Sequence, residues 1–194
     1  MQSKPVFLEA DWSWLIMLNY EIDPEKLLPL VPFGTELDFY NGTCYISIVG
    51  FWFSNTRVKK IGFPFHRNFE ELNLRFYVRR KSAGGWRRGV VFVKELVPKF
   101  AIAFIARTLY NENYISLPMA HEHIFENKIP QKISYSWKLN NHWNHLSVSP
   151  EVEERSFISN SEQEFITEHY WGYSAKNENS SIEYEVQHPA WTYR

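Results

Sequence analysis

The sequence offers little that could crosslink the chain or hold it in a membrane. Cys44 is its one cysteine in 194 residues, which excludes an intramolecular disulfide and a thiolate metal cluster, and we interpret it as a small core residue. No apolar run reaches the length needed to cross a bilayer, and the first residues lack the apolar segment of a signal peptide. We therefore expect a cytoplasmic protein that has no membrane partner.

Neither sign of charge is in excess. The chain has 21 Lys and Arg against 22 Asp and Glu, a formal net charge of −1, so its composition gives no reason to expect nucleic acid as a partner. A basic cluster that carries one tryptophan could stack single-stranded nucleic acid, but a solvated hairpin tip is the simpler interpretation. The cluster consists of Arg79, Arg80, Lys81, Trp86, Arg87 and Arg88.

Apolar and aromatic residues, by contrast, are plentiful. Hydrophobic residues make up 44% of the chain and aromatic residues 18%, and aromatic side chains favour strands and the interiors of sandwiches and barrels. A chain of this length forms one domain, here 1–194, that buries about 70% of its unfolded surface. We expect a mainly β protein with a few helices (α+β), built on a closed or strongly curved antiparallel sheet.

Turn and capping signals divide the chain into short elements. Asn41-Gly42 is a strong hairpin signal, Asp23 caps a short helix, and Ser161 with Glu164 has the pattern of a capping box. We predict helices at 23–30, 99–110 and 161–168, and a loop at 59–65. We predict strands at 7–21 (with room for a short helical entry), 36–40, 43–54, 69–79, 89–93, 119–125, 132–139, 142–148, 171–175 and 181–187.

The strand at 69–79 alternates strictly, as expected of a strand with one face on a core. Its apolar positions are Leu72, Leu74, Phe76 and Val78, and its polar positions are Glu71, Asn73, Arg75, Tyr77 and Arg79. The polar row suits a solvated outer face with cross-strand ion pairs, which the pattern alone favours. It equally suits the polar wall of a cavity inside a curved sheet, and that alternative stays open.

Four histidines raise the question of a metal site. His121 and His123 would lie on one face of a strand at a spacing that metals can use, and His142 and His145 lie on a nearby strand. No further ligand follows from the spacing, so we interpret them as edge histidines and expect no metal and no cofactor. Phosphate-binding glycine loops and nucleophile elbows are also absent from the sequence.

Several segments together resemble the YqjF-like proteins, a bacterial family of unknown function. They are residues 30–38, 49–51, 69–78, 89–92, 106–107 and 188–191, and the most specific is the strand Glu71-x-Asn73-x-Arg75-x-Tyr77-Val78. The family is related in fold to acetoacetate decarboxylase. The resemblance therefore implies an antiparallel β-barrel or double sheet that encloses a cavity, with peripheral helices.

Acetoacetate decarboxylase works through a lysine that forms a Schiff base. The resemblance puts the corresponding position near Tyr114, and no lysine lies between Lys99 and Lys128. Lys94 could serve in principle, but beside Glu95 it is better explained as an exposed ion-pairing residue. Without an amine there is no electron sink, so we do not expect a Schiff-base decarboxylase.

The leading hypothesis is a β-barrel that binds a small anion such as a carboxylate or keto acid, because a guanidinium pairs with a carboxylate through two hydrogen bonds. Its predicted ligand-binding residues are Glu71, Asn73, Arg75, Tyr77, Arg107 and Tyr114, with Phe51, Trp52 and Phe76 as apolar wall. One alternative is an enzyme on small organic acids that uses Glu71 or Glu70 as acid or base, although no catalytic residue can be assigned. Another is a structural or interaction protein, and a homo-oligomer is compatible with the aromatic surplus.

Overall fold

The fold is built on one large, curved sheet, which we describe from a computed structural model at residues 8–58, 66–110, 112–189 and 191–194. Its strand order is β1-β3-β4-β5-β11-β12, with β2 added beside β4 and β6 beside β5. All pairs are antiparallel except β5 with β6 and β5 with β11. The strands are β1 (Leu8–Glu21), β2 (Glu36–Leu37), β3 (Tyr45–Val58), β4 (Phe69–Ser82), β5 (Gly85–Val97), β6 (Tyr114–Ser116), β11 (Trp171–Asn177) and β12 (Ser180–Glu185).

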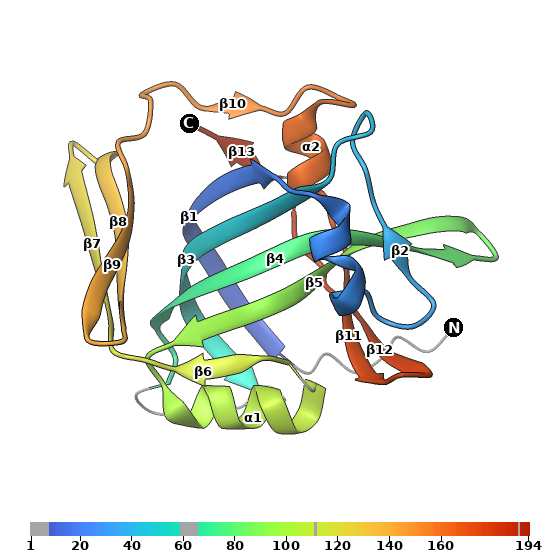
Figure 1. The fold of residues 1–194 in the computed structure, drawn as a ribbon. Coiled ribbons are helices and arrows are strands. Elements are labelled where there is room, and N and C mark those ends of the chain that lie inside the picture. Colours follow the sequence, from blue (N-terminus) through green and yellow to red (C-terminus); the bar gives the residue numbers. More distant parts are fainter. Residues whose placement is uncertain (1–7, 59–65, 111, 190) are drawn as a thin grey trace.

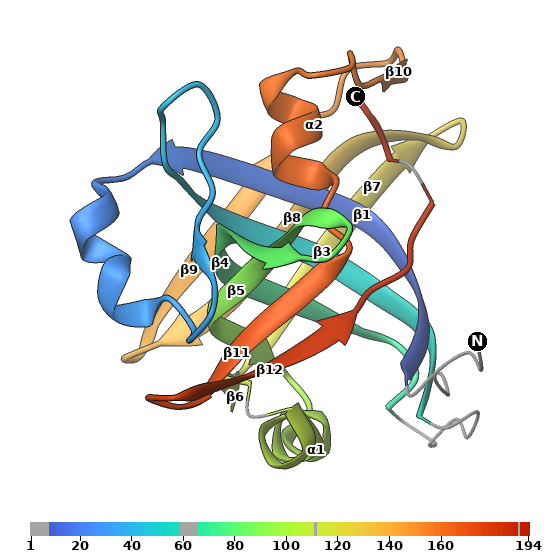
Figure 2. The same ribbon diagram turned by 90° about the vertical axis from the view of Figure 1, so that its right-hand side faces the viewer.

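Smaller elements surround this sheet. In both views the main sheet is strongly twisted, with α1 at its lower end and α2 at its upper end (Figures 1 and 2). The three-stranded sheet β7-β8-β9 stands on one side (Figure 1). The elements are η1 (Pro24–Lys26), η2 (Leu28–Leu30), α1 (Phe100–Tyr110), β7 (Met119–Glu126), β8 (Ile129–Leu139), β9 (His142–Val148), β10 (Arg155–Ser156), α2 (Glu162–Thr167) and β13 (Thr192–Tyr193).

The predicted class, mainly β with a few short helices, is confirmed, but a closed barrel is not. Within the described residues, β1 and β12 are the two ends of the strand path, and they do not pair with each other. The long helix at 99–110 and the strands at 119–125, 132–139 and 142–148 are found close to their expected bounds. The loop predicted at 59–65 lies outside the described residues.

Two local predictions were wrong, and the short helical entry for which the confirmed strand at 7–21 left room does not form. The segment 23–30 is two 3-10 turns and not a short helix, although Asp23 does cap the first by accepting from the backbone N–H of Glu25 at 3.0 Å. Pro29 has no N–H to donate, so a continuous helix cannot form there. The predicted strand 36–40 is reduced to Glu36–Leu37, and β1 is extended from Leu8 onward, without a helical entry.

Both faces of β4 are covered, which explains why its polar row is not solvated. We use the term inner face for the face of β4 that carries Glu71, Asn73, Arg75 and Tyr77. On this face the apolar clusters include Ala103 of α1 and Phe165 and Ile166 of α2. On the outer face, Leu72 packs with the three-stranded sheet through Ile133, Tyr135 and Leu146, and Phe76 and Val78 pack with Leu27 and Leu37.

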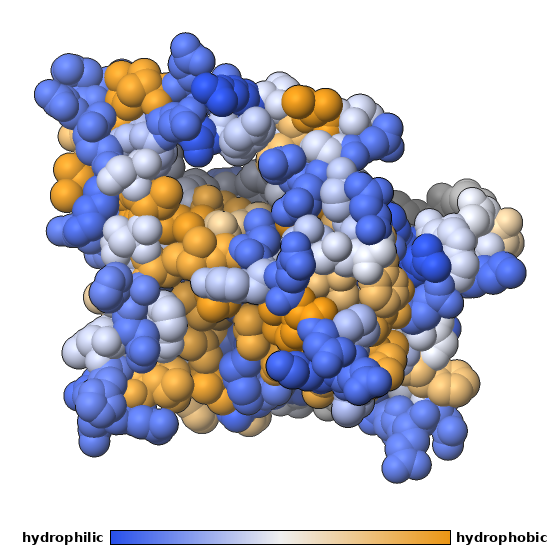
Figure 3. Space-filling view, turned by 45° about the horizontal axis from the view of Figure 1, so that its top comes forward, coloured by the Kyte–Doolittle hydropathy of each residue, from blue (hydrophilic) through white to orange (hydrophobic). Residues whose placement is uncertain are grey.

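Some large apolar side chains stay at the surface. Leu28, Leu30 and Phe33 are exposed, and apolar residues form a broad area on the face shown in Figure 3. Exposed apolar area of this kind is compatible with association between subunits. The homo-oligomer therefore stays a prediction that a size measurement in solution would check.

Replacing Ser161 with alanine is expected to lower the free energy of unfolding by about 1 kcal/mol, because the α2 cap would be lost. The Ser161 hydroxyl accepts from the backbone N–H of Glu164 at 3.2 Å, and α2 carries the buried Phe165 and Ile166 into the core. Denaturant unfolding would measure the loss. Ser161→Asp should retain the stability, and Ser149→Ala in an exposed loop is the control; an equal effect of the two alanine variants would contradict the capping role.

Candidate functional site

Strand register brings polar side chains from three strands together on the inner face. Asn73 on β4 lies opposite Glu95 on β5, and Glu95 lies opposite Tyr114 on β6. Glu71 and Arg75 flank Asn73 on β4, one strand repeat to either side. The result is a continuous polar row in the middle of an otherwise apolar face.

A β-bulge in β5 is what puts Glu95 in this row. Leu74 of β4 is opposite Lys94 of β5, and the following residue, Arg75, is opposite Phe92. Val93, between Phe92 and Lys94, is therefore left without a partner on β4. Phe92 and Glu95 are three positions apart and would face opposite ways in a regular strand. The extra residue re-aims the strand, so that Glu95 shares the face of Phe92.

The row contains a cluster of three buried carboxyl groups, which we call the acid cluster: Glu71, Glu95 and Glu112. Glu71 is 2% exposed, Glu95 2% and Glu112 7%. The Tyr114 hydroxyl donates to Glu71 Oε2 at 2.9 Å, and Asn73 Nδ2 lies 3.4 Å from Glu71 Oε1. The Tyr184 hydroxyl of β12 donates to Glu112 Oε1 at 2.7 Å.

Burial makes the acid cluster hold protons near neutral pH. It raises the pKa of Glu71 to about 7 against the opposing hydrogen bonds from Tyr114 and Asn73. Burial likewise raises the pKa of Glu112 to about 7, opposed by the Tyr184 hydrogen bond. The pKa of Glu95 is raised well above its ordinary value by burial and then by the charges of Glu71 and Glu112. Carboxyl groups this close cannot all ionise together, so they titrate as a unit.

The other end of the row is basic. Arg75 donates through one terminal nitrogen to the backbone carbonyl of Ile166 in α2 at 3.3 Å, and its guanidinium lies 5.8 Å from the centre of the Tyr77 ring. The His169 ring packs against the Tyr77 ring in a tilted arrangement, with 4.8 Å between ring centres. Burial, followed by the charges of Arg88 and Arg75, holds the pKa of His169 well below its ordinary value.

Three buried atoms of the row lack a hydrogen-bond partner among the described residues. They are the donor Arg75 Nε and the acceptors Asn73 Oδ1 and Glu95 Oε2. In the same described part of the chain, no ion pair joins Arg75 to a carboxylate, whereas Arg79, Arg80, Arg87 and Arg88 are each paired with one. Buried polar atoms are rarely left unpaired, so this part of the inner face is where a ligand or water would bind.

A surface pocket of about 400 Å³ reaches the acid cluster. Strands β6 and β11 both pair with β5 but at different ends of it, and the pocket lies at the stretch of β5 between them, Val91 to Val93. Glu112 lines this pocket and also belongs to the acid cluster, so we call the cavity the Glu112 pocket. It is lined by Leu30, Val91, Phe92, Val93, Arg107, Glu112, Asn113, Ser174 and Ala175.

Most of the predicted site residues lie together. Glu71, Asn73, Arg75 and Tyr77 share the inner face, and Tyr114 joins them through its hydrogen bond to Glu71. Arg107 is different, because it is exposed on α1 and lines the Glu112 pocket. Whether these six residues bind a ligand stays a prediction.

Other predicted neighbours belong to the opposite face. Trp52 pairs with Glu70, and its ring packs at a tilt against the His121 ring with 4.3 Å between ring centres. Phe76 belongs to the outer apolar cluster. Of the proposed aromatic wall, Phe51 alone lies on the inner face, opposite Glu71. Glu70 is also outer, with its Oε2 3.3 Å from His121 Nδ1, so it cannot act beside Arg75.

The histidines do not converge. His121 and His123 lie on the face of β7 that packs against the main sheet, where His123 Nε2 is 3.2 Å from the Tyr135 hydroxyl. His145 pairs with Ser136, the neighbour of Tyr135, and so points to the other face. Across the described residues, no group of three or more His, Cys, Asp or Glu side chains is arranged to hold a metal ion.

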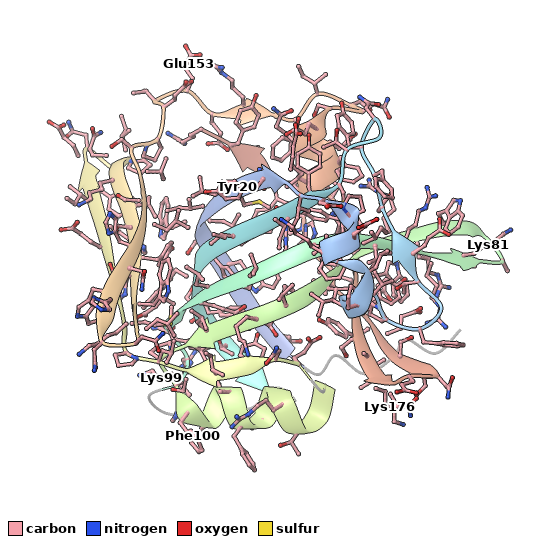
Figure 4. The ribbon with its side chains drawn as sticks, in the orientation of Figure 1. Tyr20, Lys81, Lys99, Phe100, Glu153 and Lys176 are labelled. Carbon is pink, nitrogen blue, oxygen red and sulfur yellow. The ribbon has the colours of Figure 1, made fainter. Side chains whose placement is uncertain are left out.

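Four lysines in the described part of the chain lie away from the polar row of the inner face. Lys81, Lys99 and Lys176 are at the periphery of the molecule (Figure 4). Lys94 is opposite Leu74, on the outer side of β5, and its Nζ donates to Asn113 Oδ1 at 2.7 Å. Separately, no helix in the described ranges has the length and apolarity to span a bilayer.

Comparison with solved structures defines the class of fold. The enduracididine biosynthesis enzyme MppR, complexed with the condensation product of pyruvate and imidazole 4-carboxaldehyde, matches with a TM-score of 0.63 at 9% identity over 89% of this chain and 64% of that chain. Acetoacetate decarboxylase from Legionella pneumophila matches with a TM-score of 0.61 at 11% identity over 92% and 65%. This is therefore a protein with the acetoacetate decarboxylase-like fold.

The chain belongs to the DUF2071 family, described as an uncharacterized conserved protein (COG2071), which matches residues 9–194. The uncharacterized protein YqjF of Bacillus subtilis is 32% identical over 117 residues, which are 59% of this chain and 46% of YqjF. The predicted resemblance is confirmed. The chain spans about half the length of YqjF and under two thirds of the MppR chain in the complex described above.

Proposed function

We propose that this protein binds a small carboxylate against Arg75 on the inner face of β4. The observation that carries the proposal is the buried, unpartnered Nε of Arg75 on a face that α1 and α2 cover in part. Arg75 is half-buried, and a guanidinium that is partly removed from water is expected to have an anionic partner, because burying an unpaired charge is costly. A ligand carboxylate fits it, since it can accept two parallel hydrogen bonds.

A relative in fold supports the choice of ligand. MppR has also been solved in complex with pyruvate, a small keto acid of the kind that Arg75 would bind. The Schiff-base step of the decarboxylases is not part of the proposal, because Tyr114 occupies the inner face where an amine would be needed. We therefore propose non-covalent binding of a carboxylate or keto acid.

Arg75→Ala is expected to weaken pyruvate binding about 10- to 100-fold, the range of one charged hydrogen-bonded contact. The melting temperature should change little, because the side chain of Arg75 makes a single long hydrogen bond to α2. Calorimetric titration with pyruvate would measure the loss. Arg79→Ala is the matched control, since Arg79 is on the same strand but pairs with Glu36 at the surface.

Two results would count against this role of Arg75. Equal weakening by the Arg79 variant would mean that general electrostatics and not a specific contact is responsible. A large fall in melting temperature for Arg75→Ala, matching the loss of binding, would mark Arg75 as a structural residue.

A second candidate function is acid–base catalysis on small organic acids by Glu71. The raised pKa of about 7 and the 2.9 Å hydrogen bond to Tyr114 favour it, because a general acid or base works best with a pKa near the working pH. Glu71 would remove a proton from the carbon next to the keto group of pyruvate and return a solvent-derived one. Deuterium exchange into the pyruvate methyl group, followed by NMR, should be faster with the wild type than with Glu71→Gln; equal rates would exclude this role.

A further inference from the structure

The unpartnered atoms of the polar row are of two opposite kinds. Arg75 Nε is a donor, Asn73 Oδ1 is an acceptor, and Glu95 Oε2 is an acceptor when the Glu95 carboxyl group is ionised. Asn73 is 3% exposed and Glu95 2%, so bulk water does not satisfy them. A ligand that has a carboxylate but no N–H group would leave both acceptors unpaired.

The protein's own donors in this region are already committed. Tyr114 donates to Glu71, and its hydroxyl is also a hydrogen-bond partner of the Glu95 carboxyl group, while Tyr184 donates to Glu112. The amide of Asn73 points its nitrogen at Glu71, which turns Oδ1 away from the acid cluster. Lys94, the lysine next to Glu95 in sequence, is bound to Asn113 on the outer side. An N–H group of the ligand is a donor that could satisfy both acceptors.

Charge leads to the same requirement. Three carboxyl groups lie together in the acid cluster, and in the described part of the chain none of the three forms an ion pair with a lysine, arginine or histidine. A buried carboxylate is stabilised by a cation that can donate to it. An ammonium group has three N–H bonds, enough for Glu95 Oε2 and Asn73 Oδ1 together.

We propose that the ligand is an amino acid in its zwitterionic form, with its carboxylate on Arg75 and its ammonium group on Glu95 and Asn73. This inference rests on the proposed function and narrows its ligand class. Arg75 and Asn73 are one strand repeat apart, about 7 Å. The spacing favours an amino group several bonds from the carboxylate, as in 4-aminobutanoate and 5-aminopentanoate.

Calorimetric titrations at pH 8 with matched pairs of probes test the inference. The pairs are butanoate with 4-aminobutanoate and pentanoate with 5-aminopentanoate, and pyruvate serves as the reference carboxylate. We expect each amino acid to bind about 10- to 100-fold tighter than its amine-free partner. Glu95→Gln should abolish this preference for the amino acid within each pair, and Glu122→Gln, at an exposed residue of the three-stranded sheet, should retain it.

A second measurement needs no variant and so does not depend on folding of Glu95→Gln. Titrations at pH 7 in buffers of different ionisation enthalpy count the protons exchanged on binding. An ammonium group placed on the acid cluster favours the ionised carboxylates, so 4-aminobutanoate should release protons that butanoate does not.

The outcomes separate the two proposals. Equal affinity within each pair, with no proton release, would overturn the zwitterion inference and leave the proposed carboxylate binding intact. If neither series nor pyruvate binds, both proposals fail together. A preference for the amino acids that survives in Glu95→Gln would also overturn the inference, because the ammonium group would then lie elsewhere.

Discussion

Glu71→Gln is expected to stabilise the protein above neutral pH and to leave it unchanged near pH 4.5. The folded-state pKa of Glu71 is raised from 4.5 to about 7, so the unfolded chain releases this proton more readily than the folded protein. The stability that the protonated group provides is present below pH 4.5 and is lost as the pH rises to about 7. A shift of this size corresponds to about 3 kcal/mol, and glutamine carries no such cost.

The measurement is the difference in melting temperature between variant and wild type from pH 4.5 to 9. We expect a difference near zero at pH 4.5 and roughly 6–12 °C in favour of the variant at pH 8. His123 and His169 have lowered pKa values, to about 4 for His123, so their protonation destabilises the fold as the pH falls below 6.5. The wild type and Glu71→Gln share this histidine effect, so it cancels in the difference between their melting temperatures.

Glu122→Gln is the matched control for the same charge change. Glu122 is exposed and pairs with Lys132 at 2.6 Å on the surface of the three-stranded sheet, so its replacement should give a small difference that varies little with pH. If Glu71→Gln gives the same flat difference, or destabilises at every pH, Glu71 does not carry a raised pKa in the folded protein. The burial argument for the acid cluster would then be wrong.

The longer strands of the fold could be predicted because each has a local signal, whereas the short strands β6, β10 and β13 were missed. The alternation along β4, the apolar run of β3 and the hairpin turn at Asn41-Gly42 all involve neighbours in sequence. The same alternation correctly sorted Glu71, Asn73, Arg75 and Tyr77 onto one face. It could not show whether that face meets water, because the covering residues come from α1, α2 and β12, far along the chain. The solvated face that the pattern alone favoured was therefore the wrong choice.

Glu95 and Glu112 were not predicted as site residues for the same reason: their neighbours in the acid cluster are set by contacts that no local sequence pattern shows. Glu95 reaches the inner face through a bulge, which shifts the face of every following residue and leaves no mark in the β5 sequence. Glu112 and Tyr184 meet across 72 positions, a separation that no local pattern covers. One signal was available, since a carboxylate in the apolar run Val90–Val97 is unusual in a buried strand. The misplacement of Trp52 and Phe76 was avoidable, because period two already assigns them to the face opposite Phe51 and Arg75.

Gly172→Ala is expected to be among the most destabilising single-methyl additions, at about 2–5 kcal/mol. Gly172 is directly opposite Tyr184 in the β11–β12 pair, and the tyrosine ring lies across it. A Cβ on Gly172 would come within 2.1 Å of Tyr184 Cζ and 2.4 Å of its hydroxyl oxygen. The ring would have to move, and the strain of overpacking adds to the loss of the buried hydrogen bond to Glu112.

Denaturant unfolding of the wild type and four variants tests this explanation of the glycine. Gly84→Ala, in the β4–β5 turn where nothing lies within 4 Å of the added carbon, should change stability by less than about 0.5 kcal/mol. In a Tyr184→Ala background, Gly172→Ala should lose most of its cost, because the added methyl then meets no ring. An undiminished cost in that background would locate the strain in the β5–β11 contact, where Gly172 pairs with Val90, and not in the tyrosine that connects β12 to the acid cluster.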